Sequence, residues 1–146
     1  MRIESLHIDR FGKLRDFDLT LEEGLTLIYG RNESGKSTVM AFLRAMLYGL
    51  NGKSASIEQN DRRRYMPWGE ISMGGSLRLT DGKQRFEIIR VFGQTKKSDT
   101  CRVTELGSGE VLPLSAGEEP GKMLLGVEEG VFADTLFVRS EEHTSE

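Results

Sequence analysis

The chain has 146 residues, enough for one domain with a hydrophobic core. Its 20 Lys and Arg against 23 Asp and Glu give a net charge of −3, which does not suggest an overall nucleic-acid-binding surface but leaves a local basic patch open. Cys101 is the only cysteine, and the two histidines, His7 and His143, show no metal-ligand spacing. We see no signal peptide and no membrane-spanning apolar run, so we expect a cytoplasmic protein with no membrane contact.

The first elements in chain order are predicted to be strands. Residues 3–8 read as a strand and residues 10–13 as a turn. Between residues 17 and 21 apolar and polar residues alternate, which predicts a half-buried second strand. Glu23-Gly24 then turns the chain into a short apolar run at 25–29, which predicts a buried strand.

A helix is predicted after this buried strand. Its apolar positions recur at helical spacing and form one face: Val39, Phe42, Leu43, Met46, Leu47 and Leu50. We expect the helix to begin near Lys36 and to stop at Gly49 and the Asn51-Gly52 pair.

Between strand and helix lies the phosphate-binding pattern G-x-x-x-x-G-K-[ST]. A chance match in a glycine-rich loop is the alternative, but strand and helix on the correct sides favour function. The predicted nucleotide-binding residues of this loop are Gly30, Asn32, Glu33, Ser34, Gly35, Lys36, Ser37 and Thr38.

The residue types of the loop suit a Mg²⁺–polyphosphate ligand. Gly30 and Gly35 permit backbone conformations that turn successive N–H groups toward phosphate, and the helix dipole adds positive charge. Lys36 would neutralise the β- and γ-phosphates, Ser37 would ligate Mg²⁺, and Thr38 would lie by the α-phosphate.

The segment 51–70 is polar and reads as a loop, with Arg62-Arg63-Arg64 at its centre. Two interpretations of this arginine run stay open. It is a solvated face, the commoner case, or it contacts nucleotide or nucleic-acid phosphates.

From Ile71 the apolar period becomes two, which predicts antiparallel strands. Ile71, Met73, Gly75, Leu77 and Leu79 would share a face. Asp81-Gly82 predicts a two-residue hairpin, and residues 84–92 return as the partner strand. Further strands are expected at 100–106 and 111–112, joined by a turn at 107–109. We expect this set to flank the nucleotide strand rather than to continue a parallel sheet.

The remaining residues are predicted to form a short helix at 120–127 and a final apolar segment at 131–138. Met123, Leu124 and Leu125 would form the apolar side of the helix.

Several of these motifs resemble the N-terminal head segment of SMC-like ABC ATPases, of the YhaN and SbcC types. The opening strand, the Phe11-Gly12-Lys13 turn and the Asn32–Thr38 form of the loop carry the resemblance most strongly. Weaker similarities lie at Arg64-Tyr65, Pro67-Trp68, Gly74-Gly75, Gly126-Val127 and Phe132. The resemblance spans about residues 1–139.

The resemblance implies an α/β P-loop NTPase fold, the N-terminal lobe of an ABC-type head with a flanking antiparallel β-hairpin layer. It implies ATP and Mg²⁺ as ligands and adds Lys13 as a residue that approaches the phosphates. In that family a C-terminal half of the same head supplies the signature motif, the Walker B acidic pair and the switch histidine. Two heads sandwich ATP, and their engagement drives DNA repair or processing, often beside a nuclease.

Three motifs needed for hydrolysis are not recognisable. The nearest Walker B candidate, residues 130–134, has too few apolar residues and is followed by Thr135 instead of Glu. Residues 114–118 look like a degenerate signature motif, but their position favours a local turn with Ser115 and Glu118 as a capping box. Ser140 stands where the family has its Q-loop glutamine.

The last residues are interpreted as a non-native tail. Residues 139–146 resemble the translation of a common sequencing-library adapter, and the join falls where a functional motif should begin. A genuine polar C-terminus is the alternative. Without the three Glu of residues 140–146 the acidic count is 23 − 3 = 20, equal to the 20 basic residues.

The sequence therefore predicts an ATP-binding N-terminal half of an ATPase head at 1–139. It divides into a P-loop core at 1–50, a linker at 51–70, antiparallel strands at 71–112 and a helical segment at 113–139. Two other classes stay open: a complete small P-loop NTPase or kinase, and a non-enzymatic interaction fragment that holds nucleotide for stability. No N-K-x-D motif supports a GTPase.

Overall fold

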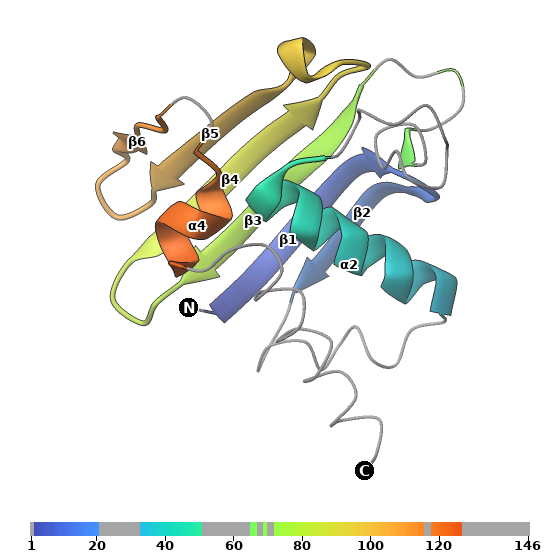
Figure 1. Cartoon of the computed structure of the whole chain (residues 1–146). Coiled ribbons are helices and arrows are strands. Elements are labelled where there is room, and N and C mark those ends of the chain that lie inside the picture. Colours follow the sequence, from blue (N-terminus) through green and yellow to red (C-terminus); the bar gives the residue numbers. More distant parts are fainter. Residues whose placement is uncertain are drawn as a thin grey trace.

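A computed structural model describes residues 2–20, 33–50, 65–66, 69, 72–115 and 118–126, without the side chains of residues 2, 33–37 and 96. In this part of the chain a six-stranded sheet has the order β2-β1-β3-β4-β5-β6, and every neighbouring pair is antiparallel. The strands are β1 (Arg2–Phe11), β2 (Leu14–Thr20), β3 (Met73–Thr80), β4 (Arg85–Phe92), β5 (Thr100–Glu105) and β6 (Val111–Leu112). Helices α2 (Glu33–Tyr48) and α4 (Pro120–Leu125) lie over the same face of this sheet (Figure 1).

Strand β1 joins the N-terminal hairpin to the later strands. It pairs with β2 along one edge and with β3 along the other, with register shifts between Ile3 and Ser5 and between Ile8 and Arg10. The predicted hairpin strands therefore extend one continuous sheet and do not form a separate flanking layer. The difference arises because β3 hydrogen-bonds to the edge of β1 that β2 leaves unpaired. The buried strand predicted at 25–29 lies outside the described residues.

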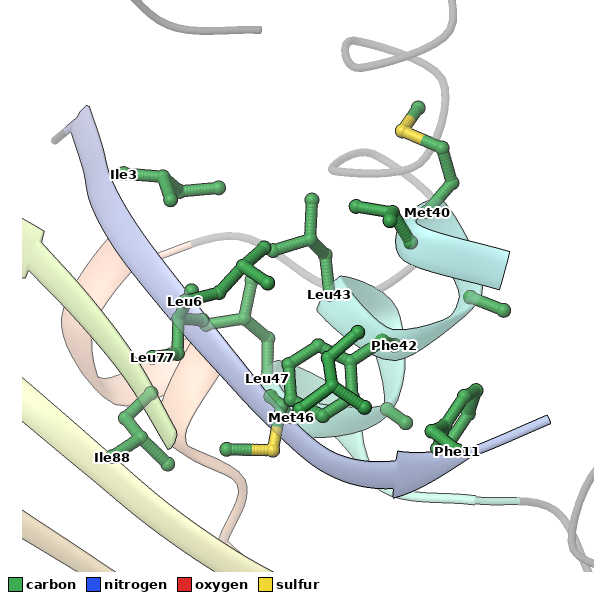
Figure 2. Close-up of a cluster of buried hydrophobic side chains, with 14 of the residues drawn as sticks. Ile3, Leu6, Phe11, Met40, Phe42, Leu43, Met46, Leu47, Leu77 and Ile88 are labelled. Carbon is green, nitrogen blue, oxygen red and sulfur yellow. The ribbon is translucent and has the colours of Figure 1, made fainter. Parts of the chain in front are cut away.

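The core between sheet and helix contains the predicted apolar positions. Met73, Leu77 and Leu79 of β3 are buried, as predicted for one face of that strand. The helical face is also confirmed, since Val39, Phe42, Leu43, Met46 and Leu47 are all at most 2% exposed. Figure 2 shows Leu43, Met46 and Leu47 directed toward Leu6 and Leu77. Burying each such side chain contributes about 1.5–3 kcal/mol relative to leaving it in water.

Gly75 occupies the core face of β3 because no larger residue fits. A Cβ at this position would overlap the carbonyl oxygen of His7 on β1. Its neighbour Gly74 has φ +150, and a Cβ there would overlap the carbonyl oxygen of Arg90 on β4. The glycine pair therefore lets β3 approach both neighbouring strands.

The hairpin between β3 and β4 lies where the sequence predicts it, but its turn is longer. Thr80 pairs with Arg85, so four residues, Asp81 to Gln84, connect the strands instead of the predicted two. Asp81 closes the turn through Oδ1, which accepts hydrogen bonds from the N–H groups of Lys83 (2.8 Å) and Gln84 (2.7 Å). This Asx-type turn uses the Asp side chain, which explains why Asp-Gly does not form the central pair.

Both helices differ from prediction at their ends. Helix α2 begins at Glu33, three residues before the predicted Lys36, since Glu suits the positive end of a helix dipole. It ends at Tyr48, and Gly49 takes φ +86, as predicted for a stop signal. Helix α4 ends at Leu125, before the predicted 127, because Gly126 adopts a left-handed φ of 73 and caps it.

Strand β1 runs three residues past the predicted end at 8, and β2 begins at Leu14 instead of 17, because Phe11 pairs with Leu14 across a turn of only Gly12 and Lys13. Arg10 and Phe11 of the predicted turn at 10–13 therefore belong to β1.

The remaining predicted boundaries are close to the observed ones. Strand β5 ends at Glu105 instead of 106, β3 begins at Met73 instead of 71, and β6 has the predicted bounds. Met123, Leu124 and Leu125 are partly buried against the core, as predicted. The arginine run at 62–64 and the apolar segment 131–138 lie outside the described residues.

Candidate functional site

The first turn of α2 contains most of the predicted phosphate loop. Glu33 to Ser37 have helical backbone, and Thr38 is buried at 7% exposure. The N–H groups of a helix's first turn lack intrahelical partners, and the dipole there favours anions. Because α2 begins early, the N–H groups of its first turn come from the motif itself rather than from residues after it. Gly30 and Asn32 lie outside the described residues, as do the side chains of residues 33–37.

The β1–β2 turn packs beside this helix. Gly12 has φ +60, and a Cβ built on it would be 3.2 Å from Cγ2 of Thr38 and 3.3 Å from Cδ1 of Tyr65. The N–H of Gly12 donates a hydrogen bond of 2.6 Å to the carbonyl oxygen of Tyr65. Lys13, the next residue in the turn, is exposed. The structure therefore places the turn that contains Lys13 against Thr38. Lys13 and Thr38 are both residues predicted for nucleotide binding.

An aromatic stack supports this turn from the core side. The Tyr65 ring stacks on Phe11 with centroids 4.8 Å apart and an interplanar angle of 16°. Phe11 in turn meets Phe42 of α2 edge-on, at 5.5 Å and 78°, and the two Phe side chains lie close together in Figure 2. Phe11 and Phe42 are fully buried, so the stack connects the surface turn to the rigid core.

The C-terminal end of α2 is held by a buried ion pair. Arg90 of β4 places Nη1 2.8 Å from Oε2 of Glu119, beside the start of α4, and also donates to the carbonyl oxygen of Met46 at 3.3 Å. The side chains are 8% and 25% exposed, respectively. A cation at the C-terminal end of a helix is favourable because it meets the negative end of the dipole. The pair thus ties α2, β4 and α4 together.

His7 lies on the opposite face of the sheet, since it alternates with the buried Leu6 and Ile8. Its Nδ1 is 2.7 Å from Oδ1 of Asp18, and its Nε2 is 2.9 Å from Oδ1 of Asp9. The hydrogen bond with Asp18 is the main reason that the pKa of His7 is raised above 6.5. No group of three or more His, Cys, Asp or Glu forms a metal site within the described ranges.

Cys101 is a free, partly exposed thiol on β5. Burial raises its pKa, which lowers the fraction of thiolate. None of the helices described is long and apolar enough to cross a membrane.

Two hydrogen bonds join Ser115 and Glu118 in the segment that resembles a signature motif. Glu118 Oε1 accepts a hydrogen bond of 3.2 Å from the N–H of Ser115, and the N–H of Glu118 donates to the carbonyl oxygen of Ser115 at 2.9 Å. The first of these bonds is one half of the predicted capping box. The helix α4 starts only at Pro120, with Glu119 as its N-cap residue and no side-chain cap.

Comparison with known proteins identifies the family. The profile of the AAA domain family matches residues 1–134. The chain belongs to the AAA domain family. The similarity of this AAA domain to three relatives supports the assignment that the resemblance at the loop implies. The domain is the N-terminal segment of an SMC-like ABC ATPase.

The matched segments cover different shares of this chain and of each relative. The protein YhaN of Bacillus subtilis is 47% identical over 52 residues, 34% of this chain and 5% of YhaN. The DNA replication and repair protein RecF of Shewanella loihica is 31% identical over 77 residues, 51% of this chain and 21% of RecF. The DNA double-strand break repair Rad50 ATPase of Methanococcus maripaludis is 24% identical over 144 residues, 97% of this chain and 14% of Rad50. The chain thus spans a small part of each relative's length.

Tyr65, Arg90 and Glu119 were not predicted as site residues of this AAA domain. Each acts through a contact distant in sequence, so no local pattern marks it. For Tyr65 the available signal is an aromatic residue directly after an arginine run, but nothing in the sequence pairs it with Gly12.

Proposed function

We propose that this chain binds Mg²⁺–ATP through residues 30–38, with Lys13 as an additional phosphate ligand. In this proposal the chain is the N-terminal half of an ATPase head with an ABC-type P-loop fold. The observation that supports it best is the packing of the Gly12–Lys13 turn against Thr38. A Cβ added to Gly12 would lie only 3.2 Å from Cγ2 of Thr38. Two predicted parts of the site, far apart in sequence, are neighbours in space.

The proposed roles follow from the chemistry of each residue. Free N–H groups in the first turn of α2, from Glu33 onward, would donate to phosphate oxygens. Lys36 would neutralise the β- and γ-phosphates, and Thr38 would lie by the α-phosphate. The Ser37 hydroxyl is the proposed protein ligand of Mg²⁺, an ion that supplies charge neutralisation between the phosphates.

Hydrolysis in this proposal needs parts that lie outside residues 1–139. A C-terminal half of the same head would supply the acidic residues that activate water, and a second head would complete the site as a homodimer. The names of the RecF and Rad50 relatives support a role of the whole protein in DNA repair, with DNA as a partner. A nuclease partner is proposed only from the resemblance at the loop. A cytoplasmic location fits this role. We propose the division at 1–50, 51–70, 71–112 and 113–139, followed by a non-native tail at 140–146.

A nucleotide titration tests this proposal. Mg²⁺–ATP added to the 146-residue chain should shift backbone NMR signals of residues 30–38, and Lys36→Ala should abolish this binding because it removes the charge that neutralises phosphate. The chain alone should show no turnover. Binding unaffected by Lys36→Ala, or Mg²⁺-dependent turnover by the chain alone, would contradict the proposal. Transfer of phosphate to a small acceptor would instead favour a complete P-loop kinase.

A further inference from the structure

We propose that Tyr65 is a positioning residue of the nucleotide site, which holds the Gly12–Lys13 turn against Thr38 so that the Lys13 ammonium reaches the phosphates. This inference rests on the proposed function. It assigns a role to Tyr65, in the linker between α2 and β3, that the phosphate-loop motif does not contain.

Two independent contacts fix Tyr65 to the turn. Its carbonyl oxygen accepts the hydrogen bond of 2.6 Å from the N–H of Gly12, and its ring stacks on Phe11, the residue before Gly12. One contact is made by the backbone of Tyr65 and the other by its side chain, and they reach two successive residues of the chain, Gly12 and Phe11. Stacked aromatic pairs at such separations are favourable beyond the area that they bury.

The other side of the turn is fixed by α2. Phe11 packs edge-on against Phe42, and Thr38 closes the space next to Gly12. Phe42 and Thr38 are both buried residues of the helix whose first turn carries the phosphate loop. The turn is therefore held between Tyr65 and the helix.

Positioning matters for Lys13 because its side chain is long, flexible and exposed. A lysine whose backbone is mobile loses much conformational freedom when it binds an anion. A fixed backbone confines the ammonium group to the neighbourhood of the helix N-terminus. The structure thus predicts that Tyr65 strengthens phosphate binding only through Lys13.

A double-mutant cycle separates this role from simple stabilisation. Mg²⁺–ATP affinity is measured by NMR titration for the wild type, Tyr65→Ala, Lys13→Met and the double variant. We expect each single change to weaken binding about tenfold, as for loss of one charge-assisted contact. The double variant should also lose about tenfold rather than about a hundredfold, because Tyr65 has nothing left to position.

Two controls accompany the cycle. Tyr65→Phe keeps the ring that stacks on Phe11 and should bind more tightly than Tyr65→Ala, and both variants keep the backbone carbonyl that accepts from Gly12. Gly12→Ala should weaken binding, since its Cβ meets Thr38 and Tyr65, whereas Gly109→Ala should not. Gly109 also has a left-handed φ (+77 against +60), but nothing lies within 4 Å of its Cβ. Comparing Gly12→Ala with Gly109→Ala separates the effect of a new side-chain contact in the turn from the effect of backbone strain.

The outcomes distinguish this inference from the proposed function. If the wild type does not bind Mg²⁺–ATP, the proposed function fails and the inference fails with it. If the wild type binds, the inference alone is overturned by unchanged affinity in Tyr65→Ala. It is equally overturned by a full additional loss in the Lys13→Met background, or by equal losses in Gly12→Ala and Gly109→Ala.

Discussion

At the residue scale, the sheet face away from the helices contains one histidine among carboxylates. His7 contacts Asp18 and Asp9 and lies 3.8 Å from Asp16, with its side chain 34% exposed. Protonation gives the imidazolium partners of opposite charge, so the folded state favours it. The pKa of His7 is raised in the fold, chiefly by the hydrogen bond with Asp18.

This raised pKa predicts a direction of stability with pH. The contribution of protonated His7 is fully present below the unfolded value of 6.5 and is lost as pH rises through the folded pKa. Asp18→Asn should lower the pKa of His7 more than Asp9→Asn, because Asp18 is the larger cause. An NMR pH titration measures the pKa of His7 in each variant, and His143→Gln assigns the two histidine signals. A larger fall in Asp9→Asn would contradict this account.

At the element scale, the contact between α2, β4 and α4 depends on one buried ion pair. Arg90 and Glu119 bridge the three elements, Gly49 leaves room for this pair, and Gly121 leaves room for the Tyr48 ring of α2. A Cβ on Gly49 would come 3.1 Å from Nη2 of Arg90, and one on Gly121 would overlap the ring of Tyr48. Small residues at both helix ends therefore allow the close approach.

Breaking this pair should be costly. Glu119→Gln leaves the Arg90 charge buried and should lower the free energy of unfolding by about 3 kcal/mol, measured by urea denaturation. The double variant with Arg90→Met should cost less than the sum of the single changes, by about 1–2 kcal/mol. The Arg78–Glu87 pair is the matched control, with a distance of 2.9 Å against 2.8 Å but with Arg78 47% exposed. Its Glu87→Gln variant should cost about 0–1 kcal/mol. Equal losses in both pairs would contradict the role assigned to burial.

At the scale of the whole molecule, the pattern of apolar residues predicted most of the described fold. Period-two runs predicted β3 to β6 within two residues at each end, and the helical face of α2 is buried as expected. The pairing of β1 with β3 was not predictable, because no local signal records which strands become neighbours across about sixty residues. The contacts of Arg90 and Tyr65 could not be predicted for the same reason, because the partners of these residues are distant in sequence.

The sequence predicts the part of the candidate site whose chemistry is local. The motif at 30–38 predicts phosphate binding by itself, because its glycine, lysine and hydroxyl positions have a fixed spacing, and this binding stays a prediction. The early start of α2 could not be predicted from the sequence, because Glu33 and Ser34 are compatible with both a loop and a first helical turn. The contact between the Gly12 turn and Thr38 required the fold, since a turn and a helix meet there.

The measurement that tests the account most directly is amide hydrogen exchange of the 146-residue chain with and without saturating Mg²⁺–ATP. The account predicts slower exchange at residues 30–38 and at Gly12 and Lys13, since nucleotide would engage the helix N-terminus and the adjacent turn. The Asp81–Gln84 turn at the β3–β4 hairpin should exchange at the same rate in both samples. Unchanged exchange at 30–38 under saturation, or protection confined to another part of the sheet, would contradict the proposal that this chain binds nucleotide through its phosphate loop.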